Sequence, residues 1–389
     1  MKYLKHSLWL LMSIILTTSY AQSTSKLASI DTTAIFYKKN KLLPGQIKPW
    51  EDGMRTTGKA GTYEWWYFDS NLKDGSTLVI VFYTKSQFNL KGGLAPRVTF
   101  ELTKPDGKVI KRSATADQNS FFASTDSCYV KVGSNIFKGN LNEYEIHLDM
   151  EGLKADISLT GNISSWRPGS GFMNFKKDKS TSFFAWLPAV PHGEVKGNIN
   201  IDGTDNLISG VGYHDHNWGN SPMNKLIHHW YWGRARVGEY ALIASYIVSE
   251  KTYDYDAQPI LLLVKNGKVI LDDFQKVKFS AEDVYIDSNT LKPVAGKLVY
   301  EYNDDNKHYK ITFNRKRDIV NRRFLSGLKG LKRSLAKLSG FDGAYMRFTG
   351  EVTIEKFENN KVTETTTEKS GVWETMYFGK ALKEEVTGR

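Results

Sequence analysis

Apolar and polar residues alternate in short runs along most of this chain, which is the pattern of half-buried β-strands. Turn signals such as Asp202-Gly203 and Asn266-Gly267 separate the runs. Many short strands divided by such turns predict an antiparallel sandwich or barrel, so the expected fold class is all-β. The clearest strands are predicted at residues 78–84, 97–102, 144–149, 194–201 and 259–264.

The chain also carries an internal repeat. Residues 63–68 lead into a turn and an apolar run, and residues 228–233 do the same. Residues 209–220 are echoed in the same way by residues 370–380. Order and offset, about 160 residues, agree at both ends, so we predict two β-barrels in tandem. The expected divisions are a signal peptide at 1–21, a lead-in segment at 22–55, an N-terminal domain at 56–222 and a C-terminal domain at 223–389.

One stretch of the predicted second barrel departs from the β pattern. Its apolar residues recur at steps of three and four, as on one face of a helix. Basic residues fill the other positions, which predicts a basic amphipathic helix near residues 319–338. Such a helix either packs across a barrel mouth with its basic face in solvent, or binds a membrane surface or an anionic ligand. The apolar positions are Val320, Phe324, Leu328, Leu331, Leu335 and Leu338.

The first residues have the pattern of a signal peptide. Lys2 and Lys5 precede a short apolar run at residues 8–16, and Ser19-Tyr20-Ala21 is a small-x-small cleavage sequence. We therefore expect an exported protein of a Gram-negative periplasm, soluble or peripheral at a membrane. Cys128 is the only cysteine, so no internal disulfide and no cysteine-based zinc site are expected.

Composition and charge limit the classes of molecule that this protein is expected to bind. Aromatic residues make up 13% of the chain, which is typical of strand-rich proteins and of pockets for flat or greasy ligands. The formal net charge is +11, and residues 315–337 hold nine Lys or Arg against one Asp. No nucleic-acid motif is present, so we expect no nucleic-acid partner and assign residues 315–337 to contact with an anionic membrane surface.

The densest chemistry lies in residues 210–220. Tyr213, His214, Asp215 and His216 place four groups that move protons or bind metals in consecutive positions. Because side chains alternate along a strand, Tyr213, Asp215 and Asn217 are predicted to share one face. His214, His216 and Trp218 are then predicted to share the other face.

Several of these motifs resemble the CrtC/AttH-like superfamily, which includes bacterial carotenoid hydratases of the hydroxyneurosporene synthase type. The resemblance covers roughly residues 55–380, and fungal Diels–Alderases are distantly similar. It implies two lipocalin-like β-barrels that hold a hydrophobic small molecule, isoprenoid or polyene-like, without a cofactor. The resemblance is carried by residues 64–69, Trp186-Leu-Pro with 193–197, 212–219, 232–234 and 345–348.

For the hydratases, the implied reaction is addition of water to a terminal isoprenoid double bond. A carboxyl group in a dry pocket stays protonated and can donate to an alkene. The family's Tyr-x-Asp pair falls on Tyr213 and Asp215, so Asp215 is the expected proton donor, with Tyr213 and His214 beside it. The hydratases also carry a His-x-Trp element, but the matching residues here are Phe184-Ala-Trp186, and the histidine is missing. His192 or His214 would have to replace it.

Alternatives to this chemistry stay open. A metal could be held by His214 and His216 with His228, His229 or Glu64, although the resemblance implies none, and we predict no metal. The histidines could instead hydrogen-bond a seam between the barrels, and Glu64 is expected to pair with Arg234 or Arg236. The predicted ligand-binding residues are Glu64, Trp66, Trp186, His216, Trp218 and Trp232.

Three functions follow from these features. The first is a cofactor-independent hydratase or cyclase centred on Asp215. The second is a non-catalytic periplasmic carrier of a lipid or other hydrophobic ligand, acting at the membrane surface. The third is an adaptor whose barrels bind another protein.

Overall fold

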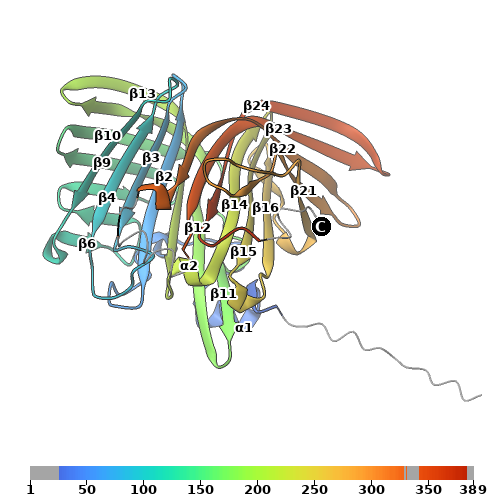
Figure 1. Ribbon diagram of the computed structural model, residues 1–389, viewed down its shortest axis with the longest axis horizontal. Coiled ribbons are helices and arrows are strands. Elements are labelled where there is room, and N and C mark those ends of the chain that lie inside the picture. Colours follow the sequence, from blue (N-terminus) through green and yellow to red (C-terminus); the bar gives the residue numbers. More distant parts are fainter. Residues whose placement is uncertain (1–25, 328–329, 331–340, 383–389) are drawn as a thin grey trace, which may run out of the picture.

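The computed structural model describes residues 26–327, 330 and 341–382. In these residues the chain forms two curled antiparallel sheets that lie side by side (Figure 1). The all-β prediction is confirmed. The predicted turns at Asp202-Gly203 and Asn266-Gly267 each close a hairpin with positive φ at both positions. Among the described residues, no helix has the length and apolar character to cross a lipid bilayer.

The first sheet uses the N-terminal half of the chain. Its hydrogen-bonded order is β5-β4-β3-β2-β13-β12-β10-β9-β8-β7-β6, and β11 joins β1 to β12. Its strands are β1 (Ala28–Ile30), β2 (Tyr63–Leu72), β3 (Thr77–Tyr83), β4 (Arg97–Thr103), β5 (Val109–Thr115), β6 (Phe121–Ala123), β7 (Tyr129–Val132), β8 (Asn135–Gly139), β9 (Glu143–Met150), β10 (Leu153–Gly161), β11 (Phe172–Lys177), β12 (Ser180–Ile201) and β13 (Thr204–Gly219).

The second sheet follows in the C-terminal half, in the order β17-β16-β15-β14-β24-β23-β22-β21-β18. The short strands β19 and β20 pair with each other. The strands are β14 (Ile227–Val237), β15 (Tyr240–Ser249), β16 (Ala257–Lys265), β17 (Lys268–Leu271), β18 (Val277–Glu282), β19 (Tyr285–Ile286), β20 (Pro293–Val294), β21 (Lys297–Asn303), β22 (His308–Arg323), β23 (Ala344–Glu358) and β24 (Lys361–Tyr377).

The two sheets repeat one topology. The order β5-β4-β3-β2-β13-β12-β10-β9-β8 in the first sheet has the same sequence of connections as the whole path of the second. In this correspondence β2 matches β14, β12 matches β23 and β13 matches β24. The repeat predicted from the motifs at residues 63–68 and 228–233 is therefore present as a repeated fold, since these motifs open β2 and β14.

The segment expected to be a lead-in is packed into the first sheet. It contributes β1, the helix α1 (Ala34–Lys39) and the 3-10 turn η1 (Pro49–Asp52), where Glu51 and Asp52 are buried. The polar sequence of this segment did not predict that it is buried. Its acids can be buried because they are paired: Glu51 binds Arg167 at 3.2 Å and Asp52 binds His214 at 3.2 Å. The other helical elements are α2 (Met223–Leu226), η2 (Gln118–Ser120), η3 (Lys251–Tyr253), η4 (Phe274–Lys276) and η5 (Phe324–Gly327).

The predicted start of the basic helix needs correction. Residues 320–323 belong to β22, where Val320 pairs with Arg347 of β23 and Arg323 pairs with Ala344. The ladder hydrogen bonds of this pairing override the helical spacing of the apolar residues. Phe324–Gly327 form the turn η5, and most of the remaining stretch, residues 328–329 and 331–340, lies outside the described residues.

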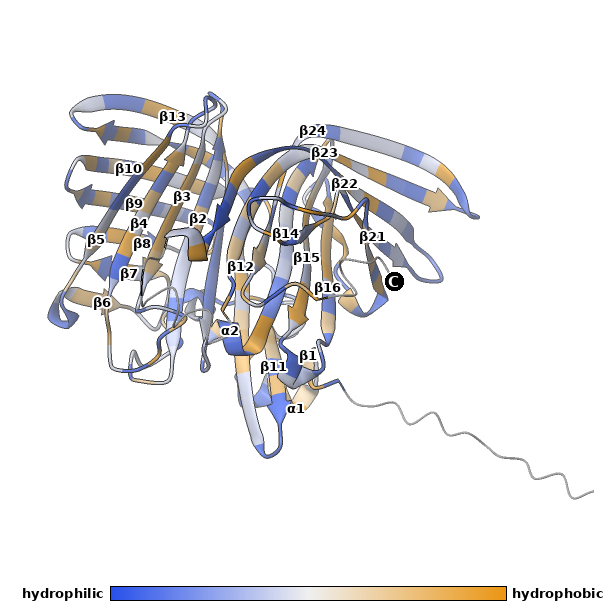
Figure 2. Ribbon diagram, in the orientation of Figure 1, coloured by the Kyte–Doolittle hydropathy of each residue, from blue (hydrophilic) through white to orange (hydrophobic). Residues whose placement is uncertain are grey.

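Apolar side chains form three cores. Hydropathy alternates along the strands in both sheets (Figure 2), and in β10 this gives strict alternation of buried and exposed positions. One core fills the curl of the first sheet around Trp66 and Phe137, and a second fills the curl of the second sheet around Trp373. The third core, which includes Tyr213 and Ile243, draws its side chains from both sheets.

A buried ion cluster also joins the sheets. Asp69 of β2 is fully buried and accepts hydrogen bonds from Arg234 of β14 and, at 3.0 Å, from Arg347 of β23. Tyr67 donates a third hydrogen bond to Asp69 at 3.1 Å. One carboxylate of the first sheet therefore binds two guanidinium groups of the second, and burial makes each partner depend on the others.

Replacement of Asp69 by Asn should destabilise the fold severely. The substitution keeps the shape but removes the carboxylate that both Arg234 and Arg347 bind, so we expect a loss of about 3–5 kcal/mol in the free energy of unfolding. Urea unfolding of the full chain measures this. Asp202→Asn, which breaks the exposed pair with Arg112, is the control and should cost less than about 1 kcal/mol. Equal losses in the two variants would contradict the role given to Asp69.

Candidate active site

Strand β13 sends the residues of the central motif to two different environments. Asp215 and Asn217 line a cavity, and Tyr213 on the same face hydrogen-bonds Asp215. His214, His216 and Trp218 point away from that cavity, and all three are buried on the opposite face of the strand. The division predicted from strand alternation is confirmed.

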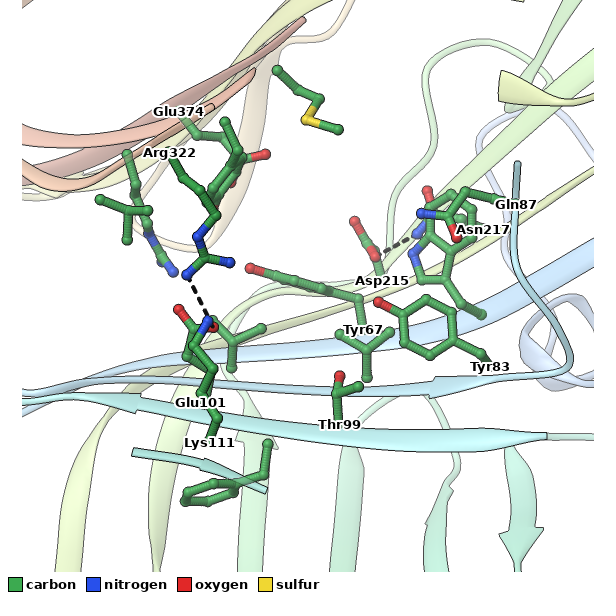
Figure 3. A pocket seen from close by; sticks show the side chains of 18 of the residues that line it. Tyr67, Tyr83, Gln87, Thr99, Glu101, Lys111, Asp215, Asn217, Arg322 and Glu374 are labelled. Carbon is green, nitrogen blue, oxygen red and sulfur yellow. Dashed lines mark hydrogen bonds and ion pairs between the residues drawn. The ribbon is translucent and has the colours of Figure 1, made fainter. Parts of the chain in front are cut away.

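The cavity lies between the two sheets and has a volume of about 900 Å³. The first sheet provides the outward faces of β2 to β5, and the second provides residues of β14, β15, β23 and β24. Figure 3 shows Asp215, Tyr67 and Tyr83 on one side and Glu374 and Arg322 on the other. The aromatic and thioether side chains of the wall are Trp65, Tyr67, Tyr83, Phe100, Phe184, Trp186, Met223, Trp230, Trp232, Phe324, Tyr345, Met376 and Phe378.

The carboxyl group of Asp215 is held by three donors. The hydroxyl of Tyr213 donates to Oδ2 at 2.7 Å, and the indole N–H of Trp186 donates to the same oxygen at 2.9 Å. The side-chain amide of Asn217 donates to Oδ1 at 2.6 Å. These bonds fix the carboxyl group in one orientation at the cavity wall.

Burial and hydrogen bonding act on Asp215 in opposite directions. Burial disfavours the carboxylate and is the larger effect, whereas Tyr213, Trp186, His214 and Asn217 favour the carboxylate. The net result raises the pKa of Asp215 to about 6. A carboxyl group with this pKa exchanges protons near neutral pH, as a general acid or base must.

Two predicted residues surround this carboxyl group as expected. Trp186 of β12 reaches Asp215 across the ladder, and its N–H also lies 3.1 Å from the hydroxyl oxygen of Tyr213. Trp232 of β14 lines the cavity from the second sheet, and its ring packs 5.1 Å from that of Tyr213. The indole nitrogen of Trp232 has no hydrogen-bond partner among the described residues. A buried donor of this kind can be satisfied by an oxygen atom of a ligand.

Five other predicted site residues are placed elsewhere. His214 lies behind Asp215, and Glu64, Trp66, His216 and Trp218 also face the interior of the first sheet rather than the cavity. His216 and Trp218 belong to the same motif as Asp215, and Glu64 and Trp66 belong to the aromatic motif of β2. The period of two along both strands places these four side chains on the face away from the cavity. These residues stabilise the first sheet and do not reach a ligand in the cavity.

The predicted pairing of Glu64 is also wrong. Glu64 accepts hydrogen bonds from the backbone of Arg55 and Thr56, and it binds Nε2 of His216 at 2.7 Å. Arg234 is instead engaged by Asp69, because position 69 lies on the cavity side of β2 and position 64 does not.

The histidines considered as metal ligands are not brought together. His228 and His229 bind each other at 2.8 Å in β14 of the second sheet, whereas His214 and His216 lie on β13 and face the interior of the first sheet. His192 binds Asn162 at 2.9 Å, and neither it nor His214 replaces the histidine that the hydratase motif would place near Trp186.

A different set of possible metal ligands is present in the first sheet. One ligand atom each of Asp52, Cys128 and His214 lie within 4.8 Å of one another, all buried. Burial lowers the pKa of His214, but Asp52 and the carbonyl of Tyr67 outweigh it, so the pKa is raised. With Tyr144 donating to Asp52 at 2.5 Å, these groups form a buried polar network, in which Oδ1 of Asp52 has no hydrogen-bond partner among the described residues.

Sequence reasoning missed several residues that the cavity uses. Tyr67, Tyr345 and Glu374 line it, and Asn217 holds Asp215. Asn217 was recognisable from alternation on β13, and Tyr67 from alternation on β2. Glu374 lies outside the motif of residues 210–220, so its position on the cavity wall was not predicted.

The fold and the site together define a two-sheet, lipocalin-like protein with a buried proton-exchanging carboxyl group in an aromatic cavity. A family model described as Diels-Alderase-like matches residues 54–330. This match covers more than half of the sequence, so the chain belongs to the Diels-Alderase-like family. The resemblance to the CrtC/AttH-like superfamily is confirmed with it.

Three relatives can be compared by sequence. The quinolone epoxide rearrangement protein of Emericella nidulans is 25% identical over 199 residues, 47% of this chain and 53% of that protein. The corresponding protein of Penicillium thymicola is 26% identical over 233 residues, 54% of this chain and 62% of its own. The chain thus spans little more than half the length of these fungal relatives. Hydroxyneurosporene dehydrogenase of Chlorobaculum tepidum is 27% identical over 275 residues, 61% of this chain and 70% of that protein.

Solved structures share the fold. An AttH-type protein of Nitrosomonas europaea superposes with a TM-score of 0.56 at 17% identity, over 86% of this chain and 98% of its own. Kievitone hydratase of Nectria haematococca gives a TM-score of 0.51 at 11% identity, over 86% and 93% of the two chains. At these identities the likeness supports the two-sheet architecture alone.

Trp186→Phe should raise the pKa of Asp215. The variant keeps an aromatic ring at the cavity wall but removes the N–H that favours the carboxylate. Infrared spectroscopy of the protonated carboxyl band, titrated with pH and compared with Asp215→Asn, measures the pKa directly. Trp50→Phe, at an indole that does not line the cavity, is the matched control and should leave the titration unchanged. A lower pKa in Trp186→Phe would show that the indole does not stabilise the charged form.

Proposed function

We propose that this protein is a cofactor-independent enzyme that protonates a hydrophobic small molecule in the cavity between its two sheets. The observation that carries the proposal is the carboxyl group of Asp215, buried at an aromatic wall and held by Tyr213, Trp186 and Asn217. The substrate we propose is isoprenoid or polyene-like, and the reaction is hydration or cyclisation at a double bond.

The cavity suits this chemistry in three respects. Its volume, about 900 Å³, lies at the upper end of the range for small-molecule sites. Its aromatic faces can stabilise a carbocation through their quadrupoles. Burial raises the pKa of Asp215 to about 6, so a protonated fraction remains near neutral pH to act as the acid.

The proposed step balances without a cofactor. The carboxyl group of Asp215 gives its proton to one carbon of the double bond, and the π electrons form the new C–H bond. The neighbouring carbon becomes a tertiary cation, to which the oxygen of a water molecule binds. Water then loses one proton to a base in the cavity, so that alkene and water become a tertiary alcohol.

The names of two relatives fit proton-driven chemistry on a strained molecule. Two fungal relatives are quinolone epoxide rearrangement proteins, and opening of an epoxide is promoted by protonation of its oxygen. The bacterial relative is named for hydroxyneurosporene, a polyene alcohol. We extend to this chain only what these names share, an organic small-molecule substrate, and we base the acid on Asp215 alone.

A non-catalytic carrier is the second candidate, because the same cavity could hold a lipid or other hydrophobic ligand without converting it. The proposed export to a periplasm and contact of residues 315–337 with a membrane surface belong to this candidate. Three basic residues of that stretch have acidic partners: Arg315 binds Asp318, Arg323 binds Asp342, and Arg322 lies 3.8 Å from Glu101. These pairs leave less positive charge for a membrane than the composition suggests.

Asp215→Asn should abolish turnover while leaving binding intact. The asparagine carbonyl can accept from Trp186 and Tyr213, and rotation of the Asn217 amide restores its bond, so affinity should change little. Loss of the proton donor should lower kcat by about 100-fold or more. The measurement uses lycopene and a quinolone epoxide as probes in ¹⁸O-labelled water, with product mass as the readout and tryptophan fluorescence for binding.

Asp205→Asn is the matched control. Asp205 is on the same strand but at its exposed end, where it binds Asn198 and Asn200, so turnover should match that of the wild type. If wild type and Asp215→Asn both bind a probe and neither converts it, the carrier is the better description. Conversion by Asp215→Asn at the wild-type rate would exclude Asp215 as the acid.

The pH dependence should have a falling limb at high pH. A general acid must be protonated to act, and the pKa of Asp215 is raised to about 6, so kcat/KM should fall tenfold per pH unit above about pH 6. A pH–rate profile from pH 4 to 9 checks this. A rate that rises through this range would instead make Asp215 a base.

A further inference from the structure

The second sheet presents its own carboxyl group to the cavity. Glu374 lies on β24 and lines the same wall as Trp230 and Trp232 of β14 (Figure 3). Its side chain is directed toward the space between the sheets, where Arg322 and Tyr67 also lie.

The repeated fold makes Glu374 the counterpart of Asp215. Asp215 stands opposite Tyr67 in the pairing of β13 with β2, and Glu374 stands opposite Trp232 in the pairing of β24 with β14. Tyr67 and Trp232 occupy the same place in the two repeats. Tyr67 follows the cavity-facing Trp65 by two positions on β2, and Trp232 follows the cavity-facing Trp230 by two positions on β14. The two acids are therefore equivalent positions of two sheets that enclose one cavity.

The hydrogen bonds around the two acids also correspond. Trp186 of β12 donates to Asp215, and Tyr345 of β23 donates to Glu374 at 2.7 Å. Trp186 and Tyr345 are themselves equivalent, since they stand opposite Asn217 and Met376 in the matching ladders. Trp230 adds a second bond to Glu374 at 3.2 Å. Each carboxyl group is thus oriented by an aromatic donor from the next strand.

The surroundings of the two acids differ in charge. Burial raises the pKa of Glu374, but the guanidinium of Arg347 next to it on β23 favours its carboxylate form. For Asp215 a charged residue that favours the carboxylate is His214, which lies on the other face of the strand. Asp69, which binds Arg347, acts against the carboxylate of Glu374. Arg347 therefore favours the ionised form of Glu374, which is the form that can accept a proton.

Tyr67 connects the two positions. It lines the cavity, stands opposite Asp215 in the ladder, and donates to Asp69. Its pKa is raised well above the ordinary value, mainly by burial and the charge of Asp69, and Glu374 contributes to the same rise. Tyr67 therefore interacts with both acids: it pairs with Asp215 in the ladder between β13 and β2, and it feels the charge of Glu374.

We propose that Glu374 is a second catalytic carboxylate, which takes the proton of the water or other nucleophile while Asp215 protonates the substrate. The proposal rests on the proposed function, because it divides that reaction between the two sheets. Asp215 loses a proton to the substrate carbon as the C–H bond forms. The nucleophilic water forms the C–O bond and transfers one proton to Glu374. Solvent returns the proton between turnovers, so no oxidant or reductant is needed.

Glu374→Gln tests this assignment on the same probes. The amide keeps a carbonyl oxygen for Tyr345 or Trp230 but cannot accept a proton, so kcat should fall about 100-fold with little change in KM. The pH profile should lose its low-pH limb, which reports ionisation of the base, and keep the high-pH limb of Asp215. Glu374→Asp, which restores a carboxylate, should recover part of the rate.

Glu364→Gln is the matched control. Glu364 is on the same strand, pairs with Lys265 at 3.0 Å and does not line the cavity, so its variant should keep the wild-type profile. Circular dichroism and thermal unfolding check that Glu374→Gln is folded.

The outcomes separate the two proposals. Loss of turnover in Asp215→Asn with a wild-type rate and both pH limbs in Glu374→Gln would overturn the role of Glu374 and leave the proposed function standing. A folded Glu374→Gln that loses affinity but not kcat would make Glu374 a binding residue and overturn the assignment. A wild-type protein that binds the probes without converting them would overturn both proposals.

Discussion

The buried bonds from Asp69 to Arg234 and Arg347 are the constraint on which the site depends. They connect β2 of the first sheet to β14 and β23 of the second, the strands that also carry Tyr67, Trp232 and Tyr345 to the cavity wall. A hydrophobic seam alone could slide, because apolar contact is not directional. A carboxylate shared by two guanidinium groups has a defined geometry, and it sets the spacing of the two walls.

This arrangement explains why the cavity lies between the two curled sheets and not inside either sheet. The interior of each sheet is filled by its own apolar core, around Trp66 in the first and Trp373 in the second. The outer faces of β2 and β14 meet instead, and aromatic side chains leave a cavity between them. Because the two sheets repeat one topology, this cavity receives equivalent positions from both halves, including Asp215 and Glu374.

Much of the fold was accessible from the sequence because alternation, turn residues and an internal repeat are local signals. The same alternation separated Asp215 from His214 correctly. It could not place the cavity, because which face of a strand meets the other sheet is decided by long-range packing. Glu64 and Trp66 were therefore assigned to the wrong side. The buried pairs of Glu51 and Asp52 were hidden for a related reason: a polar segment is recognised as part of a core only when its partners are known.

Strand β13 has two independent faces, and this has a consequence for how the protein can change. Positions 214, 216 and 218 are bound into the interior of the first sheet, so variation there is limited by folding. Positions 215 and 217 line the cavity and belong to none of the three apolar cores, so they can be exchanged with less risk to the fold. In such a strand, the residues that stabilise the fold and the residues that determine the reaction lie on different faces and can change independently. Related chains can thus diverge in chemistry through a few residues while keeping the same architecture.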